Sequence, residues 1–243
     1  MSHRPACALV LFARAPRPGR VKTRMAPWLD AGEALALHRA LLQDSIVLLK
    51  KAAKELSALP LLAFSEPWRP EPGNDDESLA DAAGGIDRLP QRGEDLGERL
   101  RNAFAALFAR GHRGVVIFGS DSPALAPERL REACALLERG AEAVLGPADD
   151  GGYYLVGLRR PHPDLFAGIP WGTARVCRAT LEAARRAGFE PALLPSCYDV
   201  DLPGDLLRLR RDSLRWAEEA EAGRPAPRRT LAFLEELVRR GRL

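Results

Sequence analysis

The sequence predicts an α/β protein, a three-layer α/β/α sandwich in which helices cover both faces of a mostly parallel sheet. Two observations carry this prediction. Short apolar runs alternate with longer helix-like segments from the first strand onward, as they do when helical crossovers connect parallel strands. The apolar runs are also continuous rather than alternating, which is typical of strands buried on both faces. We expect one domain over residues 1–243, with C-terminal helices from about residue 203.

The first half of the chain opens with a strand over 6–13 (ACALVLFA) and an irregular loop over 14–25 that contains two prolines and a glycine. Asp30 and Glu33 have the spacing of a capping box, which predicts a helix from there to about Glu55. The pattern then predicts a strand over 61–65, a loop over 66–76, a helix over 95–110, a strand over 114–119 and a helix over 127–139.

In the second half, strands over 141–146 and 153–158 flank a Gly-Gly turn. A helix over 173–187 ends at Gly188, and a short strand over 192–194 follows. The chain closes with helices over 203–221 and about 228–240, which the candidate linker 223–227 separates.

Composition excludes some classes of protein. Hydrophobic residues make up 46% of the chain, which is too many for a disordered protein. Lys and Arg exceed Asp and Glu by only 36 to 33, so binding to nucleic acid is not implied. No apolar stretch is long enough to span a membrane. The four cysteines show neither zinc-ligand spacing nor a disulfide framework, so we expect a cytoplasmic protein.

In open α/β sheets, ligands bind beyond the carboxyl ends of the strands. The loops 14–25, 119–125, 147–152 and 197–205 follow strands or lie beside them, so the candidate site residues are sought there. The four histidines adjoin none of these loops and have no predicted role.

The first loop carries five basic residues in eleven positions, namely Arg14, Arg17, Arg20, Lys22 and Arg24. Its prolines and Gly19 favour an irregular backbone whose N–H groups can face an anion, and the basic side chains would hold phosphates. The spacing matches neither a Walker A loop nor a dinucleotide fingerprint. A solvated basic loop is an equally good interpretation of the charges alone, and the position after a buried strand favours phosphate.

Aspartates follow two other strands. Asp121, after the run GVVIF, is well placed to bind a hard cation such as Mg²⁺ or Mn²⁺. The alternative is that Asp121 or Ser122 caps the helix that begins near Pro127. Asp199 and Asp201 share one face of an extended segment and could reach one metal, although a capped turn has similar weight.

The segment 148–154 (ADDGGYY) joins two strands. Its acids and tyrosines can shape a pocket for an acceptor molecule, and Gly151 and Gly152 would let a ligand approach the backbone. Asp-Gly is also a strong signal for a hairpin turn. Both interpretations can hold together.

The order of these motifs resembles the GT-A-like nucleotide-diphospho-sugar transferase superfamily. More narrowly, it resembles the bacterial radical-SAM/selenodomain-associated transferases, a family associated with arsenosugar-type glycosyltransferases. The resemblance runs from the first strand to about residue 210. The matching segments are FARAPRPGRVKTRM (12–25), GEDLGERL (93–100), GSDSPAL (119–125), GPADDGGYYLVGL (146–158), PWGTARV (170–176) and DVDLPGDL (199–206).

The resemblance implies roles for individual residues. Arg14, Lys22 and Arg24 would contact the nucleotide phosphates, and Gly97 would lie beside the base or ribose. Asp121 would take the place of the metal-binding carboxylate of a DxD motif. No second aspartate stands two positions later, so Asp199 and Asp201 would supply the missing ligands. The residues facing the acceptor would be Asp149, Asp150, Tyr153 and Trp171, with Asp150 as general base.

Three functions follow from this combination. The first is metal-dependent glycosyl transfer from a nucleotide-diphospho-sugar to a small-molecule acceptor, with Asp121, Asp150 and Lys22 at the reaction centre. The second is nucleotidyl transfer of the guanylyl- or cytidylyltransferase type, with release of pyrophosphate from a nucleoside triphosphate. The long basic loop resembles those enzymes more closely than ordinary glycosyltransferases, which seldom carry one. The third is nucleotide binding without catalysis, which the incomplete DxD pair suggests.

Overall fold

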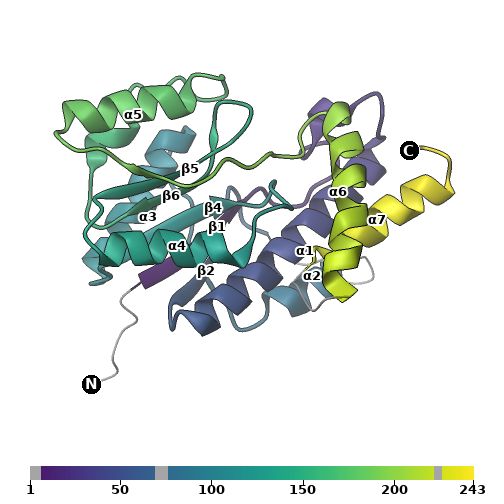
Figure 1. Ribbon diagram of the computed structural model, residues 1–243, viewed down its shortest axis with the longest axis horizontal. Coiled ribbons are helices and arrows are strands. Elements are labelled where there is room, and N and C mark those ends of the chain that lie inside the picture. Colours follow the sequence, from purple (N-terminus) through teal and green to yellow (C-terminus); the bar gives the residue numbers. More distant parts are fainter. Residues whose placement is uncertain (1–6, 69–75, 222–225) are drawn as a thin grey trace.

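A twisted mixed sheet forms the centre of the computed structural model, which describes residues 7–68, 76–221 and 226–243 (Figure 1). The strand order is β3-β2-β1-β4-β6-β5-β7. Within the described residues, β6 alone runs antiparallel to its neighbours β4 and β5. The strands are β1 (Cys7–Ala13), β2 (Leu59–Phe64), β3 (Asp87–Arg88), β4 (Gly114–Gly119), β5 (Ala143–Pro147), β6 (Tyr153–Leu158) and β7 (Ala192–Leu193).

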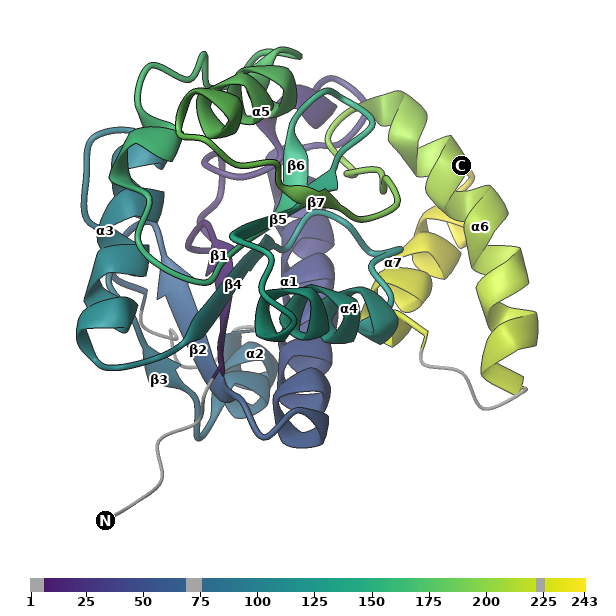
Figure 2. The ribbon, with the colours of Figure 1, turned by 60° about the vertical axis from the view of Figure 1, so that its left-hand side comes forward.

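Helices cover both faces of this sheet. One face packs against α1 (Ala31–Glu55), α2 (Asp76–Ala83) and α4 (Pro127–Glu138). The other face packs against α3 (Leu96–Ala109) and α5 (Val176–Arg186). Two further helices, α6 (Pro203–Glu221) and α7 (Arg228–Arg239), lie to one side of the sheet, where α7 packs along α1 (Figure 2). Short 3-10 helices occur at η1 (Thr23–Met25) and η2 (Pro163–Phe166).

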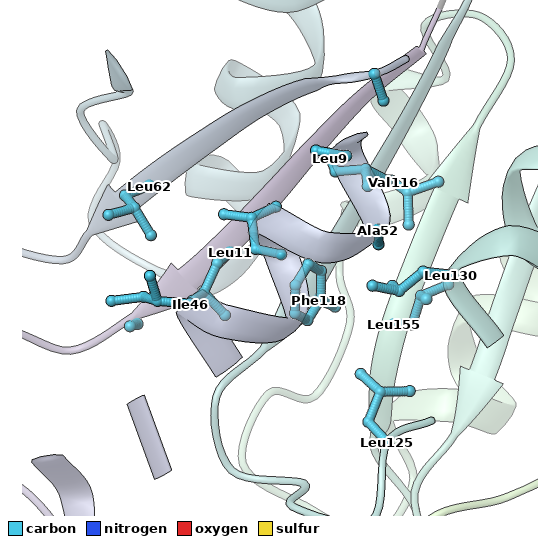
Figure 3. Packing of buried hydrophobic residues seen from close by; sticks show 14 of the residues in the cluster. Leu9, Leu11, Ile46, Ala52, Leu62, Val116, Phe118, Leu125, Leu130 and Leu155 are labelled. Atoms are coloured by element: carbon cyan, nitrogen blue, oxygen red, sulfur yellow. The ribbon is translucent and has the colours of Figure 1, made fainter. Parts of the chain in front are cut away.

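The central strand β1 shows why its sequence is continuously apolar. Leu9 and Leu11 pack with Ile46 of α1 and Phe118 of β4 on one face of the sheet (Figure 3). Ala8, Val10 and Phe12 point to the opposite face, into the cluster built around α3. Successive side chains of a strand point to opposite faces, so a strand covered on both sides has no polar position.

The three-layer sandwich with a mostly parallel sheet is confirmed. The capping box at the start of α1 is also confirmed, because Asp30 accepts from the Glu33 N–H and Glu33 accepts from the Asp30 N–H. Two elements were not expected, the short helix α2 and the two-residue strand β3. The loop over 66–76 and the linker over 223–227 fall partly outside the described residues. Within the described ranges, no helix is both long and apolar enough to cross a membrane.

Helix α7 is fastened to α1 by the half-buried carboxylate of Asp44. Asp44 of α1 accepts hydrogen bonds from the Arg229 N–H (3.1 Å), the Thr230 N–H (2.8 Å) and the Thr230 hydroxyl (2.8 Å). Asp44 therefore caps the N-terminus of a helix 185 residues further along the chain, where the first N–H groups have no partner within the helix.

We expect Asp44→Ala to lower the free energy of unfolding by about 1–2 kcal/mol, since the N-terminal N–H groups of α7 lose their acceptor. Urea unfolding would measure the loss. Asp44→Asn keeps one carbonyl oxygen in place and serves as the matched control, with a smaller expected loss. Equal losses in both variants would contradict the capping role.

Candidate functional site

A cavity of about 810 Å³ opens beyond the carboxyl ends of β1, β2 and β4 and beside the start of β6. This is the edge at which open α/β sheets bind ligands. The basic loop after β1 lines it through Arg14, Arg20, Lys22 and Arg24, and the opposite wall carries Asp121 and Asp201. The structure therefore brings together residues that lie up to 187 positions apart.

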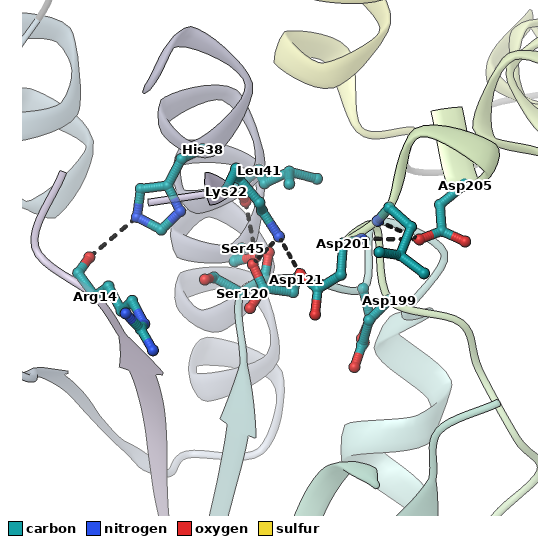
Figure 4. Close-up of polar contacts among 12 residues, drawn as sticks. Arg14, Lys22, His38, Leu41, Ser45, Ser120, Asp121, Asp199, Asp201 and Asp205 are labelled. Atoms are coloured by element: carbon teal, nitrogen blue, oxygen red, sulfur yellow. Dashed lines mark hydrogen bonds and ion pairs between the residues drawn. The ribbon is translucent and has the colours of Figure 1, made fainter. Parts of the chain in front are cut away.

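Lys22 joins the two walls. Its ammonium group lies 2.5 Å from Asp121 Oδ1 and 3.0 Å from Asp201 Oδ1 (Figure 4). The Lys22 side chain is only 3% exposed, whereas those of Asp121 and Asp201 are 42% and 39% exposed. Burial alone would lower the pKa of Lys22, but the two carboxylates outweigh it and raise that pKa. Burial would raise the pKa of Asp121, but Lys22 together with the nearby basic groups outweighs burial and lowers that pKa.

The backbone of Lys22 is left-handed, with φ 48° and ψ 34°. A residue with a Cβ rarely adopts this region, so the surrounding structure has to hold it there. The adjacent Val21 and Met25 are buried, with 2% and 0% exposure, which fixes the loop on both sides of Lys22. This constraint aims the ammonium group inward instead of toward solvent.

The segment before α6 delivers the late aspartates. Cys197 pairs with Pro147 and Asp149 at the end of β5, through N–H to O distances of 3.1 and 3.0 Å. Further along, the Val200 N–H donates to the Asp121 carbonyl at 2.8 Å. These backbone bonds extend the sheet edge and place Asp199 and Asp201 beside Asp121 (Figure 4).

Asp205 serves another purpose. One of its oxygens accepts from the N–H groups of Asp201 and Leu202, at 3.0 and 2.7 Å. It thus holds the turn that leads into α6, and it lies in the first turn of that helix.

Asp199 lies in the same acidic group and accepts a hydrogen bond from the Ser122 hydroxyl. Burial raises its pKa to about 7, an effect that Ser122 opposes and that the charges of Asp121, Asp201 and Asp150 add to. The alternative role of Asp121 and Ser122 as a helix cap is not seen, because α4 is capped at Ala126 without a side-chain hydrogen bond.

Asp121 and Asp201 converge on one cationic atom, the Lys22 nitrogen. Within the described ranges, no group of three or more His, Cys, Asp or Glu side chains is arranged to hold a metal ion. A set of two convergent carboxylates fits a hard divalent cation whose other ligands are phosphate oxygens and water, as is usual for Mg²⁺. The donor set is therefore compatible with a metal brought in by a nucleotide.

His38, to which the sequence assigned no role, lies against the cavity on α1 and is 3% exposed. Its Nε2 lies 3.0 Å from the Arg14 carbonyl oxygen. A carbonyl only accepts, so Nε2 carries the proton. Burial lowers the pKa of His38, which keeps the ring neutral. His38 thus fastens the start of the basic loop to α1.

The basic side chains of the loop divide into two groups. Arg14, Arg20 and Arg24 are solvent-exposed residues that line the cavity. Arg17 is directed elsewhere, since it pairs with Glu66 (3.4 Å) and donates to the Pro67 carbonyl (3.1 Å). Gly19 stands at the exposed turn between them with φ +68°, which a residue with a side chain rarely adopts.

The acceptor residues expected in the segment 148–154 are only partly at the cavity. Tyr153 lines it. Asp149 instead pairs with Arg208 at 2.7 Å, and Asp150 accepts from the Gly152 N–H at 2.8 Å within a tight turn. A Cβ on Gly151 would meet the Ala174 carbonyl oxygen at 2.2 Å, so this glycine permits close packing of the turn against the start of α5. The turn interpretation holds, and an acceptor role for the two aspartates stays a prediction.

Gly97 is buried beneath Trp171 and does not line the cavity. A Cβ there would lie 2.7 Å from both the Trp171 Nε1 atom and the Phe166 carbonyl oxygen. Trp171 in turn packs edge-on against Tyr153, with ring centroids 6.2 Å apart. The structure thus shows a packing reason for both residues and no direct nucleotide contact for Gly97.

Gln91, Ser65 and His38 line the cavity without having been expected there. Gln91 follows β3, which is too short to produce a periodic pattern. His38 lies within a helical apolar stripe, where a buried histidine more often serves the core. Ser65 directly follows the end of strand β2, so the rule that ligands bind beyond the carboxyl ends of strands could have identified it as a site residue.

The family model described as uncharacterized protein conserved in bacteria (DUF2064) matches residues 48–173. The chain belongs to this family. A crystal structure from Desulfovibrio desulfuricans G20, provisionally assigned as a nucleotide-diphospho-sugar transferase, is 32% identical, with 97% of this chain and 96% of that chain covered and a TM-score of 0.78. No protein with a curated functional description matches the chain.

More distant structures share the fold. CMP:2-keto-3-deoxy-manno-octonic acid synthetase complexed with CTP is 14% identical, with a TM-score of 0.51 and coverage of 86% of this chain and 98% of that chain. Glucosyl-3-phosphoglycerate synthase from Mycobacterium tuberculosis, in complex with Mn²⁺, UDP and phosphoglyceric acid, is 15% identical, with a TM-score of 0.50 and coverage of 84% and 73%. The chain therefore has the nucleotide-diphospho-sugar transferase fold.

The raised pKa of Asp199 predicts a pH-dependent stability. Between about pH 4 and pH 7, folded Asp199 holds a proton that the unfolded chain has released, so the free energy of unfolding falls as pH rises. We expect Asp199→Asn to remove this fall and to be more stable than the parent protein at pH 8, by roughly 1–3 kcal/mol at about 1.4 kcal/mol per pKa unit. Urea unfolding at pH 4 and pH 8 in EDTA would measure it, and parallel pH profiles for both proteins would refute it.

Proposed function

We propose that this protein is a metal-dependent transferase that uses a nucleotide-activated donor, and that it transfers a glycosyl group from a nucleotide-diphospho-sugar. One observation carries the proposal: basic side chains from the loop after β1 and aspartates from the loops after β4 and before α6 meet across one cavity, joined by Lys22. Such opposed charges suit a diphosphate with its cation. The 32% identical relative supports the same class of reaction.

In this proposal, Arg14, Arg20 and Arg24 hold the phosphates of the donor and Lys22 neutralises charge on them. Asp121 and Asp201 bind Mg²⁺ or Mn²⁺, with Asp199 beside them. The metal, when bound, stabilises the negative charge that grows on the departing phosphate. Gly19 allows the loop to turn around the anion, and the backbone N–H groups of that loop complete the phosphate site.

The acceptor would enter beside Tyr153, on the β6 side of the cavity. We retain Asp150 as the general base for its hydroxyl group. The Asp150 side chain folds back on the Gly152 N–H, so this role requires the 149–152 turn to present Asp150 to the bound acceptor. Asp149, Gly151, Gly152 and Trp171 would frame that position.

Nucleotidyl transfer is a second candidate, which the density of basic side chains at the cavity favours. A nucleoside triphosphate brings one more phosphate than a nucleotide-sugar, and an acceptor phosphate attacking the α-phosphorus needs positioning more than a base. Binding without catalysis is the third candidate. The convergence of three aspartates on one small region argues against it, because a binding protein gains nothing from their mutual repulsion.

The closer resemblance to radical-SAM/selenodomain-associated transferases also belongs to this proposal. It rests on the motifs 12–25, 93–100 and 119–125. We place the reaction in the cytoplasm, where nucleotide-sugars and small acceptors meet and where four free cysteines remain reduced.

A donor screen in Mg²⁺ or Mn²⁺ tests the proposal, with release of pyrophosphate and of nucleoside diphosphate followed separately. The panel contains the common nucleoside triphosphates and nucleotide-sugars, with pooled alcohols and phosphates as acceptors. Nucleoside diphosphate release from one nucleotide-sugar supports glycosyl transfer. Pyrophosphate release from a triphosphate would contradict glycosyl transfer and support nucleotidyl transfer instead.

We expect Asp121→Ala to abolish metal-dependent nucleotide binding while the protein remains folded, because the carboxylate nearest to Lys22 is lost. Calorimetric titration of a nucleoside diphosphate with and without Mn²⁺ would measure this. The control is Asp87→Ala, an exposed aspartate on β3. Metal-dependent binding that survives in Asp121→Ala would rule out its role as a ligand.

The phosphate-binding loop makes a separate prediction. Lys22→Ala with Arg24→Ala should weaken binding of a nucleoside diphosphate far more than binding of the nucleoside. Because Lys22 also bridges two aspartates, the cleaner variant is Arg20→Ala with Arg24→Ala, for which we expect at least a tenfold loss for the diphosphate. Arg17→Ala is the matched control, since Arg17 pairs with Glu66. Equal weakening of nucleoside and diphosphate would contradict phosphate binding.

A further inference from the structure

The strand order places Asp121 and Gln91 on opposite sides of β1 at the edge of the cavity. Asp121 follows β4, and Tyr153 opens β6 on the far side of it. On the other side of β1 lie the ends of β2 and β3, followed by Ser65 and Gln91 (Figure 2). A ligand whose phosphates lie at the basic loop therefore extends in one of two directions, toward Tyr153 or toward Gln91.

The side chain of Gln91 is held in one orientation. Its Nε2 donates to the Ala63 carbonyl at 2.6 Å, at the end of β2, and to the Ala13 carbonyl at 3.4 Å, at the end of β1. Both partners are carbonyl oxygens, which only accept, so the amide cannot be flipped without losing both bonds. Gln91 is half-buried and lines the cavity.

This fixed orientation leaves Oε1 as the available end of the amide. Among the described residues, no group donates a hydrogen bond to it, and it is not a fully buried atom. An amide whose two donors are occupied by the sheet presents a pure acceptor to a ligand. It can pair with an N–H group and repels a carbonyl oxygen placed in the same position.

The surroundings of Gln91 suit an uncharged, flat group. Leu96 and Leu100 of α3 line the cavity, and Leu100 packs in one apolar cluster with Ala63, whose carbonyl binds Gln91. Glu66, which also lines the cavity, pairs with Arg17 at 3.4 Å. Arg99 lines the cavity as well, and its guanidinium donates to the carbonyls of Gly93 (3.0 Å) and Glu94 (3.4 Å). Away from the aspartates, the cavity thus offers apolar side chains, charged groups that are already paired or hydrogen-bonded, and one directed acceptor.

We propose that Gln91 determines the nucleobase that the site accepts, by accepting a hydrogen bond from an exocyclic amino group. The inference rests on the proposed nucleotide-dependent function. Cytosine, adenine and guanine carry such an amino group, whereas uracil has a carbonyl oxygen where cytosine has its amine. Sites that hydrogen-bond a polar group reject analogues lacking it, because the protein group is then left unpaired.

The test compares nucleoside diphosphates that differ in one amino group, by calorimetric titration in Mn²⁺. The pairs are CDP with UDP, ADP with IDP, and GDP with IDP. We expect the tightest ligand to carry the amino group and to bind at least about tenfold more tightly than its counterpart. In Gln91→Met, this ratio should fall to about threefold or less, through weaker binding of the amino-bearing ligand.

Gln91→Lys is a second variant. It retains donors for the carbonyls of Ala13 and Ala63 but removes the acceptor, so the affinity ratio between the paired ligands should fall in this variant too. Asn102→Ala is the control, because Asn102 donates to the Arg92 carbonyl at 2.8 Å and supports the same loop without lining the cavity. Its ratio should equal that of the parent protein.

A parent protein that binds UDP or IDP as tightly as the amino-bearing partner would overturn the role of Gln91. Preservation of the ratio in both Gln91 variants would do the same. Failure of every diphosphate to bind would instead refute the proposed nucleotide-dependent function, so the two failures are distinguishable.

Discussion

The two ion pairs of Lys22 are the contacts on which the arrangement of the site depends. Asp121 and Asp201 lie 80 residues apart in the chain but side by side on one wall of the cavity, where their charges would repel each other without a cation between them. Lys22 is buried and its backbone is held in a left-handed conformation, so its ammonium group has little freedom to leave. Buried charges are tolerated only when they are paired. The basic loop, the end of β4 and the segment before α6 are therefore fixed relative to one another by this one side chain.

The C-terminal helices make that geometry possible. Met25, beside the basic loop, packs in one apolar cluster with Leu37 of α1, Val200 of the aspartate segment and Leu206 of α6, and Leu234 of α7 completes the cluster. The same cluster thus supports both walls of the cavity from behind. Asp44 holds α7 against α1 at the far end of this arrangement. The helices after residue 203 carry none of the site residues and instead determine where Asp199 and Asp201 lie.

The sequence predicted the elements that have a strong periodic signal and the loops that follow them. Strand β1 and helix α1 were predicted correctly, because an apolar run and a capping box are local features. Strand β3 has two residues and depends on pairing with β2, so nothing local indicates it. The rule that ligands bind beyond the carboxyl ends of strands identified Asp121 and Lys22 as site residues, but it did not predict that they bind each other. Gln91 and the packing of Trp171 on Gly97 depend on contacts between distant segments, which no spacing in the chain reveals.

Within the proposed function, the same ion pairs would couple the two ligands of the site. Lys22 and a divalent cation would compete for the oxygens of Asp121 and Asp201. A cation alone would then have to displace a buried ammonium group that forms no other ion pair among the described residues. The phosphates of a nucleotide supply that anion. Binding of nucleotide would then free the carboxylates for the cation, and binding of the cation would free Lys22 for the phosphates. Such coupling is reciprocal by thermodynamic necessity.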